Sequence, residues 1–254
     1  MGTYQLTFSP TGGVGRVSDL VTGPLAQEAT LVDLTDRQLD FSSFRFTQED
    51  VCIVAVPSYG GRAPESALSR LKQMTGGGAA AVLIAVYGNR AFEDTLIELQ
   101  DTLTEAGFWC AAGIAAIAEH SILREFAAGR PDEEDRKVLT GFAEEVHCKL
   151  EAGDRSGELS LPGNRPYREF GGVPIKPKAG KGCTGCGLCA EKCPVGAIPE
   201  ESPASTDEKR CISCMRCVSI CSNDSRSVNK LLASAAALKL RKECSVRKGC
   251  ALYL

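Results

Sequence analysis

The spacing of eight cysteines between residues 183 and 221 suits the binding of iron–sulfur clusters. The first four follow the pattern C-x2-C-x2-C-x3-C-P and end at Pro194. The last four repeat it, with Ser222 in place of the proline. Three cysteines at steps of three lie on one loop, so that their thiolates converge on one metal site. The fourth cysteine of each run has turned away from that site and reaches the other one. The pattern therefore predicts two interlocked metal sites. Their eight candidate ligands are Cys183, Cys186, Cys189, Cys193, Cys211, Cys214, Cys217 and Cys221.

Two other interpretations of these cysteines are weaker. Zinc binds paired C-x2-C motifs, but zinc sites rarely use a third cysteine at the same step twice over. The N-terminus MGTYQLTFSPTGG has no readable signal peptide, so we expect a cytoplasmic chain in which structural disulfides are rare. Glycines 182, 185, 187 and 196 favour clusters, because backbone must pass close to inorganic sulfur.

Residues 179–226 resemble the bacterial-type ferredoxins that carry two 4Fe–4S clusters. The resemblance implies one cluster held by Cys183, Cys186, Cys189 and Cys221. It implies a second cluster held by Cys211, Cys214, Cys217 and Cys193. The missing proline after Cys221 leaves these ligands intact but changes the local backbone.

A glycine-rich turn near the N-terminus is the second stretch whose residues could bind a ligand. It contains Ser9, Pro10, Thr11, Gly12, Gly13 and Val14, and it joins an expected strand to an expected helix. Hydroxyl groups, a flexible backbone and the start of a helix together suit a phosphate group. The turn is neither a Walker loop nor a dinucleotide fingerprint. The alternative is a strand–helix junction without a ligand.

This turn resembles the flavodoxin phosphate loop, [S/T]-x-T-G-x-[S/T], with Val14 in place of the last hydroxyl. Two later loops resemble those that enclose the isoalloxazine ring of FMN. The first contains Pro57, Ser58, Tyr59, Gly60, Gly61 and Arg62. The second contains Tyr87, Gly88, Asn89, Arg90, Phe92 and Asp94. The resemblance implies that these residues bind FMN.

The resemblance also suggests roles for individual side chains. Tyr59 would stack on the flavin ring, and Arg62 or Arg90 would favour the reduced, anionic flavin. His120 and Ser121 would form a third contact. The alternatives are an ordinary loop aromatic, solvated arginines and a structural histidine.

The elements that must position these loops alternate between strands and helices. Expected strands are 3–9, 29–34, 51–57, 79–87 and 113–118, all short and apolar. Expected helices are 15–25, 64–74, 92–106 and 132–150. Such alternation predicts an α/β fold, a flavodoxin-like doubly wound parallel sheet of order 2-1-3-4-5. A small α+β two-cluster ferredoxin domain and a C-terminal helical tail follow it.

We expect four segments along the chain. They are an FMN-binding domain over residues 1–151, a glycine- and proline-rich linker over 152–178, the ferredoxin domain over 179–226 and a basic helical tail over 227–254. Cys52, Cys110 and Cys148 are expected to be buried small apolar residues. Cys244 and Cys250 are expected to be free thiols.

Composition narrows the function class. The chain has 254 residues, 43% of them hydrophobic, and no apolar run long enough for a membrane span. Residues 1–150 have 12 Lys+Arg and 21 Asp+Glu, whereas residues 151–254 have 17 and 11. The basic half suggests nucleic acid at first, but two anionic clusters offset much of that charge. Two histidines give little support to a histidine-based hydrolase.

The sequence therefore predicts an electron-transfer flavo-iron–sulfur protein. Clusters carry one electron and flavin one or two, so electrons would pass between the clusters, FMN and a redox protein partner. We expect no nucleic acid and no membrane span, and a homodimer is a further expectation. Two alternatives stay open. One is a flavin-dependent reductase with its own small substrate, and the other is a ferredoxin whose first domain only docks a partner.

Overall fold

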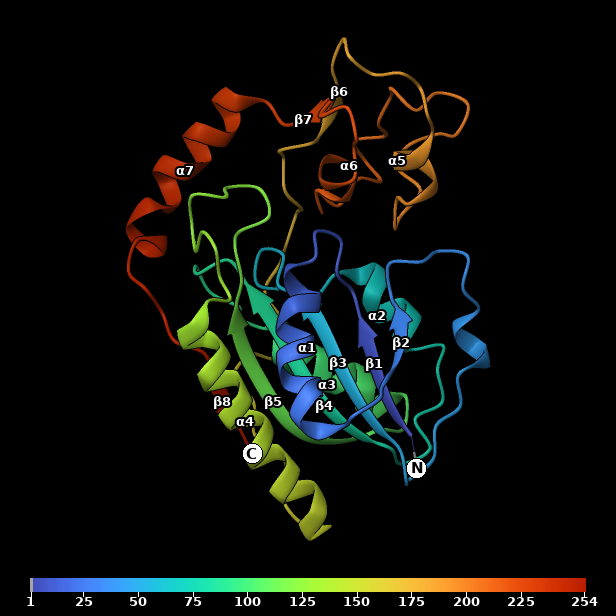
Figure 1. The fold of residues 1–254 in the computed structure, drawn as a ribbon, viewed down its shortest axis with the longest axis vertical. Coiled ribbons are helices and arrows are strands. Elements are labelled where there is room, and N and C mark those ends of the chain that lie inside the picture. Colours follow the sequence, from blue (N-terminus) through green and yellow to red (C-terminus); the bar gives the residue numbers. More distant parts are fainter. Residues whose placement is uncertain (1) are drawn as a thin grey trace.

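A parallel sheet forms the centre of the N-terminal part. The structure, a computed structural model, describes residues 2–254 (Figure 1). The sheet has the order β2-β1-β3-β4-β5-β8, and its first five strands run parallel. These strands are β1 (Thr3–Thr7), β2 (Thr30–Asp33), β3 (Val51–Pro57), β4 (Ala80–Tyr87) and β5 (Trp109–Ile117). The predicted order 2-1-3-4-5 is confirmed.

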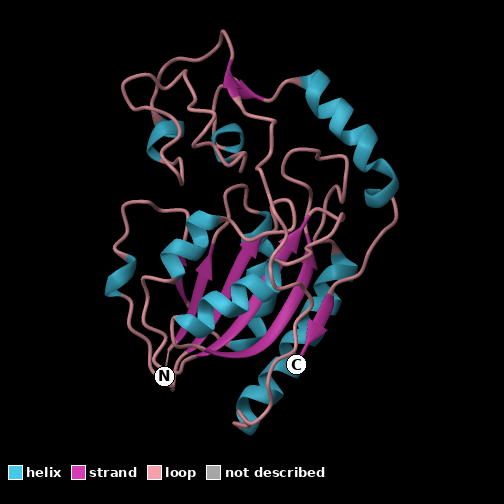
Figure 2. Cartoon of the chain, turned by 180° about the vertical axis from the view of Figure 1, so that it is seen from behind, coloured by secondary structure: helices cyan, strands magenta, loops and turns pink. Residues whose placement is uncertain are grey.

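Helices cover both faces of this sheet (Figure 2). On one face lie α1 (Gly13–Leu25) and α4 (Glu133–Ala152), and on the other α2 (Glu65–Leu71) and α3 (Thr95–Glu105). A short 3-10 helix spans Phe41–Ser43. In residues 2–254 we find no helix with the length and apolarity to cross a bilayer.

Local sequence explains why these elements form where they do. Every residue of β4 is buried, as expected for a central parallel strand covered on both faces. Helix α4 begins with a capping box in which Asp132 accepts from the backbone N–H of Asp135 and the Asp135 side chain accepts in return. It ends at Gly153, whose φ of 64° is left-handed.

The cysteine-rich part lies over the carboxyl ends of the strands (Figure 1). Its two short strands, β6 (Lys178–Ala179) and β7 (Arg226–Ser227), pair antiparallel. Between them are one-turn helices α5 (Leu188–Glu191) and α6 (Arg216–Ser219). Pairing β6 with β7 closes this segment, so that its two ends lie together.

The C-terminal segment differs from the expected helical tail in one respect. Helix α7 (Lys230–Cys244) is present, but the chain then returns to the main sheet as β8 (Ala251–Tyr253), antiparallel to β5. Three residues are too few for a periodic sequence signal, so only tertiary pairing reveals this strand. The expectation that Cys148 is buried is wrong, because it lies on the exposed side of α4; Cys52 and Cys110 are buried as predicted.

Candidate functional site

One predicted quartet of cysteines surrounds a small cavity. Cys193, Cys211, Cys214 and Cys217 all line it, together with apolar side chains from the same segment. Burial raises the pKa of Cys214 to about 12, and the neighbouring Cys193, Cys217 and Cys211 add to that increase. The fourth cysteine of the first run therefore lines the same cavity as the first three of the second run. A buried thiol with so high a pKa becomes a thiolate at neutral pH only when metal displaces its proton.

Backbone N–H groups point at several of these sulfurs. Ala197 N donates to Cys193 Sγ at 3.2 Å, and Ser213 N donates to Cys211 Sγ at 3.4 Å. Ser225 N makes the same contact with Cys221 Sγ at 3.3 Å, and N–H groups after Cys221 lower its pKa. Such donors stabilise thiolates and tune the potentials of the clusters they bind.

The other quartet is closer to solvent. Cys186 is exposed, Cys183 and Cys221 are half-buried, and Cys189 is buried. The turn after Cys221 reaches the first cysteine loop, because Asn223 Nδ2 donates to Thr184 Oγ1 at 3.1 Å. Among the residues described, no three His, Cys, Asp or Glu side chains approach closely enough to hold a single metal ion.

The two cysteine loops repeat an unusual backbone. Gly185 and Gly187 have φ values of 70° and 79°, and the equivalent Ser213 and Met215 have 56° and 62°. A left-handed conformation is easy for glycine but is strained for a residue with a Cβ atom. The second loop therefore keeps side chains at two positions where glycine would be less strained, and such strain often marks a functional contact.

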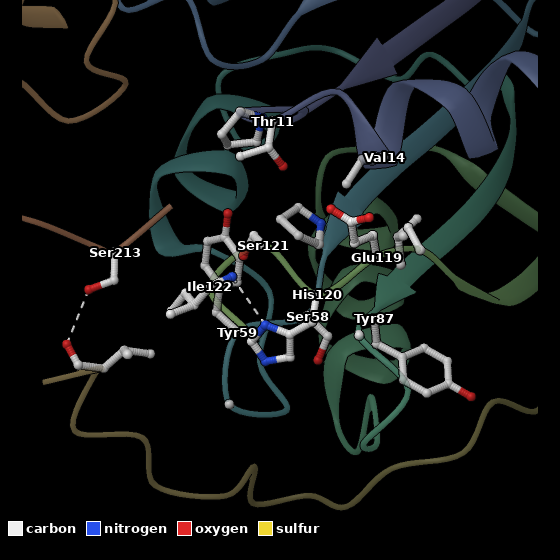
Figure 3. A pocket seen from close by; sticks show the side chains of 18 residues that line it. Thr11, Val14, Ser58, Tyr59, Tyr87, Glu119, His120, Ser121, Ile122 and Ser213 are labelled. Atoms are coloured by element: carbon white, nitrogen blue, oxygen red, sulfur yellow. Dashed lines mark hydrogen bonds between the residues drawn. The ribbon is translucent and has the colours of Figure 1, made fainter. Parts of the chain in front are cut away.

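A second cavity lies at the carboxyl ends of the strands, and we call it the strand-end cavity (Figure 3). It has a volume of about 110 Å³ and is lined by the ends of β3 and β4 and by the segments that follow β1, β3, β4 and β5. It includes these predicted residues: Pro10, Thr11, Gly13, Val14, Pro57, Ser58, Tyr59, Gly60, Tyr87 and Gly88. His120 and Ser121 also line it. Ligands of doubly wound sheets bind in this position, outside the strand ends where the order reverses.

The start of α1 provides donors at one end of the strand-end cavity. Gly12 is left-handed with φ 85° and, as the N-cap residue of α1, has no side chain to accept from the helix. Ser9 Oγ accepts from Gly15 N at 2.8 Å, which fixes the turn and leaves the N–H groups of Gly13 and Val14 at the start of the helix. The first N–H groups of a helix have no intrahelical acceptor and attract anions. Val14, in place of the flavodoxin hydroxyl, is buried against the core between α1 and the sheet.

Two aromatic or titratable side chains stand out in this cavity. Burial lowers the pKa of His120 to about 4, and Arg90 adds to the effect, so the imidazole is neutral at pH 7. Its Nδ1 accepts from the backbone N–H of Ile122 and Leu123, both at 3.2 Å, so Nε2 carries the proton. Burial raises the pKa of Tyr59 well above its usual value, and the nearby Cys214 adds to the rise.

Several residues predicted for the flavin loops make other contacts. Arg62 is bound by the carboxylate of Glu98 and lines a neighbouring cavity. Asn89 Nδ2 donates to the carbonyl groups of Cys244 and Val246, at 2.7 and 2.9 Å.

The remaining loop residues hold the backbone around the cavity. Arg90 pairs with Glu93. The buried Asp94 accepts from the backbone N–H of Asn164 and Arg168, at 2.9 and 2.7 Å. Phe92 packs on Tyr87, and Gly61 lies next to Glu93, so that a Cβ atom on Gly61 would meet the Glu93 carboxylate.

Val173 and Ser213 line the strand-end cavity although the sequence did not indicate them. Val173 comes from the linker. Ser213 lies between two cysteines of the quartet Cys193, Cys211, Cys214 and Cys217, which we call the buried quartet. Ser213 Oγ donates to the Val173 carbonyl at 3.1 Å. Arg216 of α6 donates to the carbonyl groups of Ser9 and Pro10, at 3.3 and 3.4 Å. These contacts join parts of the chain 40 to 207 residues apart, and no local sequence signal predicts them, so these positions required the structure.

Comparisons with known proteins agree with this two-part description. Residues 182–225 match the family of the 4Fe-4S dicluster domain, which confirms the predicted iron–sulfur character of this segment. A search of curated proteins finds no match.

Among solved structures, a flavodoxin of Streptococcus pneumonia TIGR4 aligns with 20% identity and a TM-score of 0.43, over 59% of this chain and 99% of its own. A short-chain flavodoxin associated with a bacterial microcompartment aligns with 19% identity and a TM-score of 0.41, over 61% and 100%. A flavodoxin from the domain Archaea aligns with 9% identity and a TM-score of 0.40, over 59% and 99%.

The strand order of the sheet itself makes the N-terminal domain flavodoxin-like. The chain therefore joins a flavodoxin-like α/β domain to a 4Fe–4S dicluster domain.

Proposed function

We propose that this chain transfers electrons between two 4Fe–4S clusters, an FMN and an external redox protein. One observation carries the proposal: Ser213, from the loop of the buried cysteine quartet, lines the same cavity as the phosphate-type turn of α1. A cluster and a flavin bound at these two sites would be neighbours. The proposed units are the flavin domain over residues 1–151 and the cluster domain over 179–226, with β8 added to the first.

The strand-end cavity offers donors for FMN at the place where doubly wound sheets bind their ligands. The N-terminus of α1, whose N-cap residue Gly12 has no side chain, would receive the phosphate, because the first N–H groups of a helix attract anions. Gly60 and Gly88 line the part where the ring would lie, and a Cβ on Gly88 would come within 2.7 Å of His120. Bound FMN would supply the exchange between one- and two-electron chemistry.

The buried quartet is the inner site in this proposal. Cys193, Cys211, Cys214 and Cys217 would hold the cluster next to the strand-end cavity, since Tyr59 lines that cavity and Cys214 is near enough to raise the pKa of Tyr59. The other quartet, with its exposed Cys186, would hold the outer cluster, where a partner can approach. The proposed order is therefore partner, outer cluster, inner cluster and flavin.

Residues of this chain also hold the inner loop against the flavin domain. Arg216 ties α6 to the turn at Ser9 and Pro10, and Lys176 Nζ donates to the Cys211 carbonyl at 2.5 Å. The strained φ of Ser213 fits this arrangement, because its hydroxyl reaches the linker carbonyl that closes the cavity. His120 keeps a proton on Nε2 at neutral pH, so it would serve as a donor to the ligand.

The first test is the metal and flavin content of anaerobically purified protein. We expect about eight iron atoms and one FMN per chain. Cys193→Ser and Cys221→Ser form a matched pair, because each should remove about four iron atoms and leave the flavin. Zinc in place of iron, or eight iron atoms without any flavin, would refute the proposal.

The order of the sites has its own test. When the flavin is reduced by a laser flash, its reoxidation by the inner cluster should stay fast in Cys221→Ser and disappear in Cys193→Ser. The opposite result would mean that the exposed quartet, not the buried one, is the neighbour of the flavin.

A further inference from the structure

A wider cavity of about 550 Å³ lies between α7 and the strand ends, and we call it the helix cavity. Leu232, Ala235, Ala236 and Leu240 of α7 form one wall. The opposite wall comes from the β3, β4 and β5 loops and from the linker. Cavities of this size hold whole small organic molecules.

The helix cavity adjoins the strand-end cavity. Both are lined by Ser58, Gly60, Tyr87, Gly88, His120, Ile122 and Val173. A molecule in the helix cavity would therefore lie next to the position proposed for the flavin ring. The residues that line only the helix cavity lie on α7, in the loop after β4, after Ile122 and in the linker.

The charged groups of the helix cavity are cationic. Arg90, Arg168 and Lys239 line it, and no Asp or Glu among the described residues does. Arg90 and Arg168 share one carboxylate, that of Glu93, and Lys239 has no ion-pair partner in residues 2–254. His120 is neutral at pH 7. Two positive charges are thus left over beside an apolar lining.

We propose that the helix cavity binds a small organic anion with an apolar body, such as an aromatic or branched-chain carboxylic acid. The apolar walls would take the hydrocarbon part, and the excess cations would take the carboxylate. This inference rests on the proposed function in one respect, since the bound acid would lie against FMN. It names the class of ligand that would occupy the space beside the flavin.

Other occupants fit less well. A protein segment would meet walls from four separate parts of the chain, whereas a small molecule needs only the space between α7 and the strand ends. The exposed Leu231 and Leu238 of α7 lie outside the helix cavity, so they do not extend its apolar wall to form a longer groove.

Calorimetric titration of the FMN-loaded, anaerobic holoprotein tests the proposal, after the flavin content has been measured from absorbance. The probes are 4-phenylbutyrate and its uncharged amide, 4-phenylbutyramide, neither of which flavin can reduce. We expect the acid to bind and the amide to bind several-fold more weakly. Equal affinities would overturn the proposed charge recognition.

Two pairs of variants on α7 control this measurement. Lys239→Gln should weaken the acid roughly two- to fivefold and leave the amide unchanged, whereas Lys242→Gln, outside the cavity, should change neither. Ala235→Trp should block both probes, and Ser234→Trp on the neighbouring exposed position should not. Binding that ignores both substitutions in the cavity would overturn the location.

Titrations with and without bound FMN distinguish a failure of this inference from a failure of the proposed function. Protein that binds the acid only when FMN is absent would show that the ring itself fills the helix cavity, and the inference would fall. Protein that never binds FMN but keeps acid binding dependent on Lys239 would refute the proposed function and retain the ligand site.

Discussion

Replacing Arg70 with methionine would test how firmly the two domains are joined. Arg70 lies on α2 with only 8% of its surface exposed. Its guanidinium donates to the carbonyl of Leu34 in the sheet domain and, at 2.6 Å, to the carbonyl of Pro194. Pro194 directly follows Cys193, so this side chain links the loop of the buried quartet to the flavodoxin-like domain.

The expected cost follows from these contacts. A hydrogen bond from a charged donor contributes about 1.5–3 kcal/mol, and the variant leaves two carbonyl groups without their donor. Part of the loss is offset, because burial lowers the pKa of Arg70 and removing a buried charge relieves that penalty. Methionine also keeps a contact with Phe41, whose ring lies 5.6 Å from the guanidinium. We therefore expect a loss of about 3 kcal/mol.

Native-state hydrogen exchange measures this loss where it occurs. The amides of residues 195–198 should exchange roughly a hundredfold faster in Arg70→Met, since 1.4 kcal/mol is a factor of ten. Arg37→Met is the matched control, because Arg37 pairs with Glu200 across the same boundary at 2.8 Å but in solvent. It should cost less than about 1 kcal/mol. If both variants accelerate exchange equally, the buried link does not join the domains as argued.

Three further predictions follow from buried groups elsewhere. In an NMR titration the His120 ring should protonate near pH 4, and a midpoint near 6.5 would contradict its burial. Because a histidine in the unfolded chain titrates near 6.5, the folded state should lose stability as the pH falls from about 6.5 to 4. Arg130→Met should lower the free energy of unfolding by about 3–5 kcal/mol, because it removes the guanidinium that pairs with the buried carboxylate of Asp135. Arg124→Met, which breaks an exposed pair, should lower it by less than about 1 kcal/mol. Similar losses in the two variants would refute this reasoning. Gly61→Ala should lower flavin content and melting temperature, because φ is 86° and a Cβ would lie 1.8 Å from a carboxylate oxygen, and unchanged flavin absorbance would argue against it.

The central strands and their order could be predicted from sequence because their signals are local. Continuous apolar runs such as Val51–Pro57 mark strands buried on both faces, and the structure begins and ends β3 at the same residues. β5 begins four residues before the expected start at Gly113, because Trp109 and Cys110 pair with Ala80 and Ala81 before a bulge. Pairing energy of that kind has no periodic signature in the strand itself.

The candidate site divides in the same way. Residues of one turn, such as Thr11 and Gly13, share a cavity because the strand–helix junction brings them there. Asn89 and Asp94, which the sequence places in the second expected flavin loop, instead hold the C-terminal segment and the linker. Those partners lie 70 or more residues away, and only the packed chain decides between a ligand and a backbone carbonyl as the partner of a loop amide.

Because β8 returns to the main sheet, the cluster domain is connected to the flavodoxin-like domain at both of its ends. Both its entry, after α4 and the linker, and its exit, through α7, lead back to the flavodoxin-like domain. It is thus an insertion tethered at two points, so thermal motion cannot carry it far from the strand ends, as a single flexible tether would allow. Removing residues 227–254 would free one tether and uncover the hydrogen-bonding edge of β5, so truncated chains should associate through that edge.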